Sequence, residues 1–123
     1  MRFLFLAKAA EPFTDRLKTL ISTHFPGGEI DVFQTIEALS QRLRQPLEEP
    51  KIAILLPGSR LDLMEILSIQ HLLRDTPIIL FAPDNERETI ALAHQLHPRF
   101  LGDCHTDCGV VPQVLEKMIK DHA

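Results

Sequence analysis

The sequence predicts an α/β fold with a single (βα)5 doubly wound parallel sheet. Five short apolar runs alternate with five longer amphipathic stretches, the order that a parallel sheet covered by helices on both faces requires. Three of the runs, the first, third and fourth, are apolar throughout, which is typical of strands buried on both faces. The 123 residues, of which 45% are hydrophobic and 24% charged, suit one globular domain, so we expect residues 1–123 to form a single domain.

The five apolar runs are the expected strands. They are Phe3–Ala7, Ile30–Phe33, Ile52–Leu56, Ile78–Ala82 and Arg99–Leu101. Asp31 interrupts the second run and the short fifth run begins with Arg99, so we expect these two to be edge strands. Right-handed crossovers with the other three in the centre are satisfied by the flavodoxin-like order 2-1-3-4-5. Other orders with the same central trio also fit the pattern.

Start and stop signals delimit a helix after each strand. Pro12 suits the first turn of the first helix, which Pro26-Gly27-Gly28 ends, and Thr76-Pro77 ends the third. We expect the first and fifth helices on one face of the sheet and the second, third and fourth on the other. The expected N-terminal capping residues of the second to fifth helices are Thr35, Asp62, the pair Asn85 and Glu88, and Asp107.

Charge and composition argue against several classes of partner. The formal net charge of -4 disfavours a nucleic-acid or anionic-membrane surface, because both attract clustered Lys and Arg. The apolar runs are far shorter than the roughly 20 residues that a membrane span needs. Two cysteines without a secretion signal indicate a reducing, cytoplasmic setting.

The segment Cys104-His105-Thr106-Asp107-Cys108 is the most chemically suggestive stretch of the chain. Two thiolates and a histidine can supply part of a zinc site, but a structural site needs four ligands and no second cysteine pair exists. We therefore expect ordinary loop cysteines, with no metal, no mutual disulfide and no cofactor.

The expected ligand crevice lies beyond the carboxyl ends of the strands where the strand order reverses, at the loops after the first and third strands. Lys8, Ser59 and Arg60 lie in these loops and can surround an anion near the start of the third helix. One interpretation is therefore a small enzyme or binding protein for an anionic, phosphorylated ligand.

Three segments carry a family resemblance: Lys51–Pro57, Thr76–Ala82 and Ala93–Leu101. With the chain length and the (βα)5 order, they make the chain similar to the receiver domain of two-component response regulators. The resemblance covers nearly the whole chain, as one receiver-like domain. It implies a response-regulator framework and a part in two-component signal transduction, whose phosphorelay acts through an aspartate of the receiver.

The sequence departs from the receiver pattern at the active positions. Where a typical receiver ends its first strand with two acidic residues that hold a divalent cation, this chain has Ala7 and Lys8. The phosphoacceptor aspartate at the end of the third strand corresponds to Leu56, or to Pro57 if the register slips by one. Neither residue can accept a phosphoryl group.

The remaining receiver positions differ as well. The Ser/Thr that ends the fourth strand corresponds to Phe81, and the conserved Lys after the fifth strand corresponds to Asp103. The aromatic switch position is kept as Phe100. Because the charges at two positions are exchanged, we expect a contact between Lys8 and Asp103, either direct or through one water. The resemblance therefore implies a pseudo-receiver that is not phosphorylated in the manner of the family.

Our principal hypothesis is a non-catalytic signalling or protein-interaction module. Receivers bind partners, or associate with themselves as homodimers, through the face formed by the fourth helix, fifth strand and fifth helix. In this chain the corresponding ranges are 86–96, 99–101 and 110–120, with Phe100 as the switch. The anion-binding interpretation is the alternative.

Overall fold

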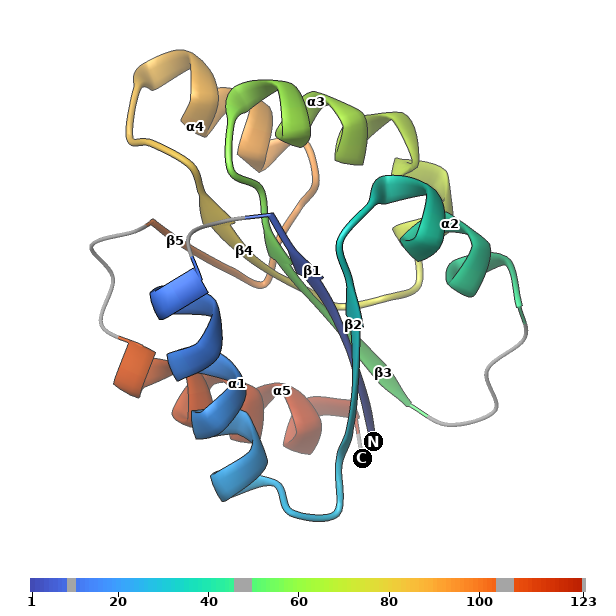
Figure 1. Ribbon diagram of the computed structural model, residues 1–123, viewed down its shortest axis with the longest axis vertical. Helices are drawn as coiled ribbons and strands as arrows, with labels where there is room; N and C mark the ends of the chain where they lie inside the picture. The colour runs from blue at the N-terminus through green and yellow to red at the C-terminus, as the bar shows by residue number, and fades with distance from the viewer. Residues whose placement is uncertain (9–10, 46–49, 104–107, 123) are drawn as a thin grey trace.

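The described residues form a five-stranded, all-parallel sheet in the order β2-β1-β3-β4-β5 (Figure 1). The computed structural model describes residues 1–8, 11–45, 50–103 and 108–122. The strands are β1 Arg2–Ala7, β2 Glu29–Phe33, β3 Lys51–Leu56, β4 Ile78–Ala82 and β5 Phe100–Asp103. The predicted fold class and strand order are both confirmed.

The helices cover both faces of the sheet. They are α1 Glu11–His24, α2 Ile36–Arg44, α3 Arg60–Ser68, α4 Arg87–His94 and α5 Val111–His122, with the short 3-10 helices η1 Gln70–Leu73 and η2 Cys108–Val110. Figure 1 shows α1 and α5 on one face and α2, α3 and α4 on the other, as the sequence predicted. No helix in the described ranges is long and apolar enough to cross a membrane.

The three central strands are buried because each of their faces packs on a helical layer. On β1, the side chains of Phe3 and Phe5 belong to the core under α1 and α5, whereas Leu4 and Leu6 belong to the core under α2, α3 and α4. All four are fully buried, and β3 and β4 are at most 4% exposed from Ile52 onward. β2 and β5 lie at the two edges and are half-buried to exposed, as predicted.

Asp31, which interrupts the second apolar run, is held by cations at the β2 edge. Its Oδ2 lies 2.7 Å from Nη1 of Arg2 and 3.7 Å from Nε of Arg42 in α2. Arg2 also pairs with Glu29. Charged pairs along an open edge discourage another strand from adding to the sheet. Asp31 therefore suits an edge strand, where its charge can pair with Arg2 and Arg42.

One helix cap is confirmed and another is corrected. Thr35 caps α2, since its Oγ1 accepts a 3.1 Å hydrogen bond from the backbone N–H of Ala38. Asp62 is not the cap of α3, because Ser59 takes that position and accepts a 3.2 Å hydrogen bond from the Asp62 N–H. Oδ2 of Asp62 in turn accepts a 3.0 Å hydrogen bond from the N–H of Gly58. A serine followed three residues later by a carboxylate satisfies the free amides of a helix start from both directions.

The start of α4 also differs from the prediction. Glu86 is the capping residue and makes no side-chain capping bond, so the expected capping pair of Asn85 and Glu88 is wrong. Oδ1 of Asp84 accepts a 2.9 Å hydrogen bond from the Glu86 N–H instead. The Glu88 carboxylate instead accepts a 3.0 Å hydrogen bond from Nη1 of Arg60. Asp107, the expected cap of the fifth helix, lies outside the described residues.

Candidate functional site

The loops that follow β1 and β3 touch each other at the carboxyl edge of the sheet. The N–H of Lys8 donates a 3.0 Å hydrogen bond to the carbonyl of Leu56. A Cβ on Gly58 would lie 2.4 Å from the carbonyl oxygen of Lys8, so this close approach of two backbones needs glycine. At the position of the expected crevice, the backbones of the two loops are therefore in direct contact.

The receiver-like positions at this edge are mostly apolar and buried. Leu56 is fully buried, Pro57 is buried and Phe81 is 3% exposed, whereas Ala7 is half-buried. Asp103 ends β5 and is half-buried. The ends of β3 and β4 thus present buried hydrophobic side chains at this edge.

Phe81 is the centre of an aromatic row that crosses from β5 to α1. Its ring centroid lies 6.1 Å from that of Phe100, with the rings inclined at 62°. On the other side, the ring of Phe13 lies 5.1 Å away at 72°. Both contacts have the edge-to-face geometry that aromatic rings prefer. The ring of Phe100 is therefore packed against a buried ring.

Lys8 pairs with Asp62 of α3. Its Nζ lies 3.9 Å from Oδ1 of Asp62, and both side chains are partly buried. Among the described residues, the ion pair of Lys8 is with Asp62 and not with Asp103, so the direct form of the expected Lys8–Asp103 contact is not found. A contact between the two side chains through one water stays a prediction. Asp62 is fixed beside Lys8 because Ser59 and Gly58 hold it in the first turn of α3, whereas Asp103 ends an edge strand on the far side of β4.

Arg60 is turned away from Lys8 and toward α4. Its Nε donates a 3.0 Å hydrogen bond to the hydroxyl of Thr89, which is fully buried. Nη1 and Nη2 bind Glu88 at 3.0 Å and Glu86 at 2.6 Å. Three bonds from one guanidinium tie the first turn of α3 to the first turn of α4.

Asp84 extends this network beyond Thr89. A hydrogen bond from the Thr89 side chain lowers the pKa of the Asp84 carboxyl from its usual value of 3.8, and the Glu86 N–H and the charge of Arg60 lower the pKa further. The ionised form of Asp84 is the one that the network holds. Asp84 therefore lies beside the network that Arg60 forms with Thr89, Glu86 and Glu88, and it is joined to that network through the Glu86 N–H.

The three proposed anion ligands are thus already engaged with other groups. Lys8 pairs with Asp62, Ser59 caps α3, and Arg60 binds the start of α4. The structure brings Lys8 and Ser59 together around Asp62 but directs Arg60 elsewhere. Sequence inspection identified Asp62 only as a helix cap, and missed both its pairing with Lys8 and the part of Thr89, although the Ser-x-x-Asp spacing was a readable signal that Ser59 and Asp62 act together.

The cysteine segment stays a prediction. Residues 104–107 lie outside the described residues, and so does the side chain of Cys108. Among the side chains that the structure does describe, no three or more of His, Cys, Asp and Glu gather as a metal site would require.

Comparisons with protein-family models, with curated proteins and with solved structures gave no match.

Proposed function

We propose that the chain is a non-catalytic signalling module that binds protein partners on a receiver-like framework without receiver phosphorylation. The observation that carries the proposal is the pair of strand ends at Leu56 and Phe81, where buried apolar side chains stand at the positions of a phosphoacceptor and its hydroxyl neighbour. Phosphoryl transfer to a side chain requires a nucleophile, cation ligands and donors that stabilise charge. The sheet order and the placement of the helices support the framework.

The partner-binding face in this proposal is formed by α4, β5 and α5. In the described part of the chain β5 has a strand neighbour on one side only, and α4 and α5 flank it from opposite faces of the sheet (Figure 1). An edge strand presents backbone groups that a partner can bind. The helices add exposed side chains of both signs, such as Arg87 on α4 and Glu116 and Lys117 on α5.

Phe100 is the aromatic residue of β5 within this face. We propose that its ring is held in one orientation. Its ring packs edge-on against Phe81, which fills the space beside it. Rotation of the Phe100 ring inward would require Phe81 to move out of the core, where it is 3% exposed. The face then has one constitutive state and needs no phosphorylation to bind.

The anion-binding alternative at the carboxyl edge is not supported by the contacts there. Each of Lys8, Ser59 and Arg60 already has a partner of this chain. An anion would have to displace carboxylates that are held within a folded network, and no observation at this edge favours that exchange.

Sedimentation velocity from about 10 µM to 1 mM tests the face with a second copy of the chain as the probe. Lys117→Glu on α5 should weaken any self-association, whereas Arg44→Glu on α2, on the other face of the sheet, should leave it unchanged. A chain that stays monomeric throughout would contradict homodimer formation. Association lost in the Arg44 variant and kept in the Lys117 variant would contradict the choice of face.

A further inference from the structure

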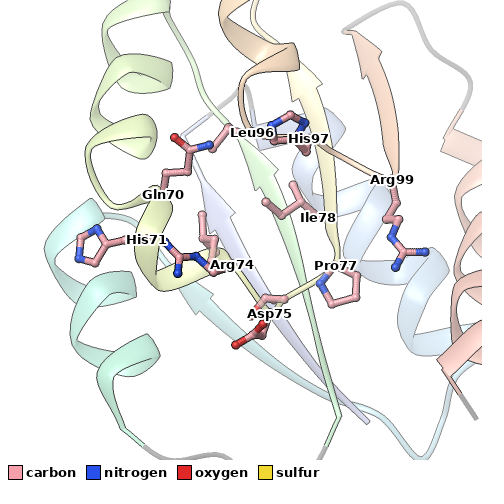
Figure 2. A pocket seen from close by; sticks show the side chains of 11 residues that line it. Gln70, His71, Arg74, Asp75, Pro77, Ile78, Leu96, His97 and Arg99 are labelled. Atoms are coloured by element: carbon pink, nitrogen blue, oxygen red, sulfur yellow. The ribbon is translucent and has the colours of Figure 1, made fainter.

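A pocket of about 630 Å³ opens at the amino end of β4. The receiver-like positions lie at the opposite, carboxyl ends of the strands. Its volume lies within the roughly 300–1,000 Å³ range of small-molecule sites. Figure 2 shows η1 and the end of α4 on either side of it, with Ile78 of β4 between them. The third helix does not continue to Thr76-Pro77 as predicted: α3 ends at Ser68, and the short helix η1 that follows lines the pocket.

The floor of the pocket is apolar and its walls are polar. Leu73, Ile78 and Leu96 are at most 4% exposed and continue into the core beneath α2, α3 and α4. At one end, Nε2 of Gln70 donates a 2.5 Å hydrogen bond to the carbonyl of Gln95, which joins η1 to the end of α4. A rigid apolar floor with a few polar groups around it is the usual construction of a ligand site.

Positive charge gathers in this pocket, although the chain as a whole is acidic. Arg74 and Arg99 stand on opposite sides in Figure 2, and Asp75 is the acidic residue among the described residues of the lining. The whole chain carries a formal net charge of -4. Within the described part of the chain, the guanidinium of Arg74 has no hydrogen bond or ion pair, in contrast to the engaged Arg60 at the other edge.

His97 lines the pocket with an unusual backbone conformation. Its φ is 52°, and among the described non-glycine residues His97 is the one whose φ is positive. A glycine is the residue that most often takes this left-handed conformation after a helix. A histidine here keeps an imidazole on the pocket wall at a site where glycine would fit the backbone better, and such outliers gather at functional sites.

We propose that this pocket binds a small organic anion, with a carboxylate or phosphate group at Arg74 and an apolar part on Leu73, Ile78 and Leu96. A guanidinium recognises either oxyanion with paired hydrogen bonds, so the headgroup is defined by its oxygens. His97 supplies a further polar contact from the opposite wall. The proposal does not rest on the receiver resemblance, although Leu96 and Arg99 of the pocket lie at the ends of the ranges 86–96 and 99–101 given for the partner-binding face.

The test is a titration of the ¹⁵N-labelled chain followed by two-dimensional NMR, with phenyl phosphate, benzoate and neutral benzyl alcohol as separate probes. Saturable shifts of the amides at 70–76 and 96–99 are expected with at least one of the two anions, and the tighter one identifies the headgroup. Benzyl alcohol should bind at least about fivefold more weakly, because it has no charge to pair with Arg74.

Two variants and a control locate the anion. Arg74→Gln should weaken binding at least about fivefold. His97→Gly, which suits the backbone and is expected to fold, should weaken it by a smaller factor. Arg16→Gln, at an exposed arginine on α1 on the other face of the sheet, should change nothing. The proposal is overturned if neither anion gives saturable shifts, if the shifts map to 58–62 instead, if benzyl alcohol binds equally well, or if Arg74→Gln binds like the unchanged chain.

Discussion

Arg60 and Thr89, 29 residues apart, join the starts of α3 and α4 through a 3.0 Å hydrogen bond from the arginine Nε to the threonine hydroxyl. The Thr89 side chain also lowers the pKa of the Asp84 carboxyl, and the rest of the guanidinium binds Glu86 and Glu88. This network occupies the carboxyl edge beside β3 and β4, where the sequence had suggested an anion site.

Removing the Thr89 hydroxyl should destabilise the fold. Thr89→Val keeps the shape of a fully buried side chain but leaves Nε of Arg60 without its acceptor. We expect a loss of about 1–2 kcal/mol in the free energy of unfolding, measured by urea denaturation. Thr19→Val, at an exposed threonine on α1 that bonds only its own helix backbone, should stay within about 0.5 kcal/mol. Equal effects of the two variants would contradict a special role for Thr89.

The contribution of Asp84 should depend on pH. Its folded pKa is lowered from 3.8 chiefly by the Thr89 hydrogen bond, so the ionised carboxylate stabilises the fold above that pH. As the pH falls below 3.8 and through the lower folded pKa, this stabilisation is lost. Asp84→Asn should therefore be less stable than the unchanged chain at pH 7 and at pH 5, and the difference should narrow between pH 4 and pH 2. Unfolding curves across this pH range provide the measurement. A stability difference between the two chains that does not change with pH would contradict the role given to the ionised Asp84 carboxylate.

Phe81 should be the most sensitive position of the aromatic row. Phe81→Ala removes a ring that is 3% exposed and packs on both Phe13 and Phe100, so we expect a loss of about 3–5 kcal/mol. Phe100→Ala should lose less, about 1–3 kcal/mol, because that ring is half-buried at an edge strand. Urea denaturation gives both values. A larger loss for Phe100 would contradict the picture of Phe81 as the residue that locks the switch position.

The fold was largely predictable because it depends on where apolar residues gather along the chain. The runs at β1, β3 and β4 are apolar from end to end, and only a central position buries both faces of such a strand. The interruptions at Asp31 and Arg99 marked the edges for the same reason. Thr35 was identified as a cap because a cap is a local hydrogen bond within four residues.

The side-chain partners at the carboxyl edge could not be predicted in this way. Lys8 pairs with Asp62 because the first turn of α3 folds over the end of β1, which is a tertiary relationship. Two residues compete to cap α3, and the pattern alone did not favour Ser59 over Asp62. The change from α3 to η1 after Ser68 was also hidden, because Leu63, Ile66 and Leu73 keep a helical spacing through it.

Intact-mass spectrometry after incubation with acetyl phosphate and Mg²⁺ tests the central claim most directly. A receiver domain with its acidic pair and phosphoacceptor intact serves as the positive control under the same conditions. We expect the control to gain the mass of one phosphoryl group and this chain to keep its unmodified mass, because the proposed receiver alignment puts Leu56 or Pro57, neither of them a nucleophile, at the position of the phosphoacceptor. A stable phosphoryl adduct on any aspartate of this chain would contradict the account.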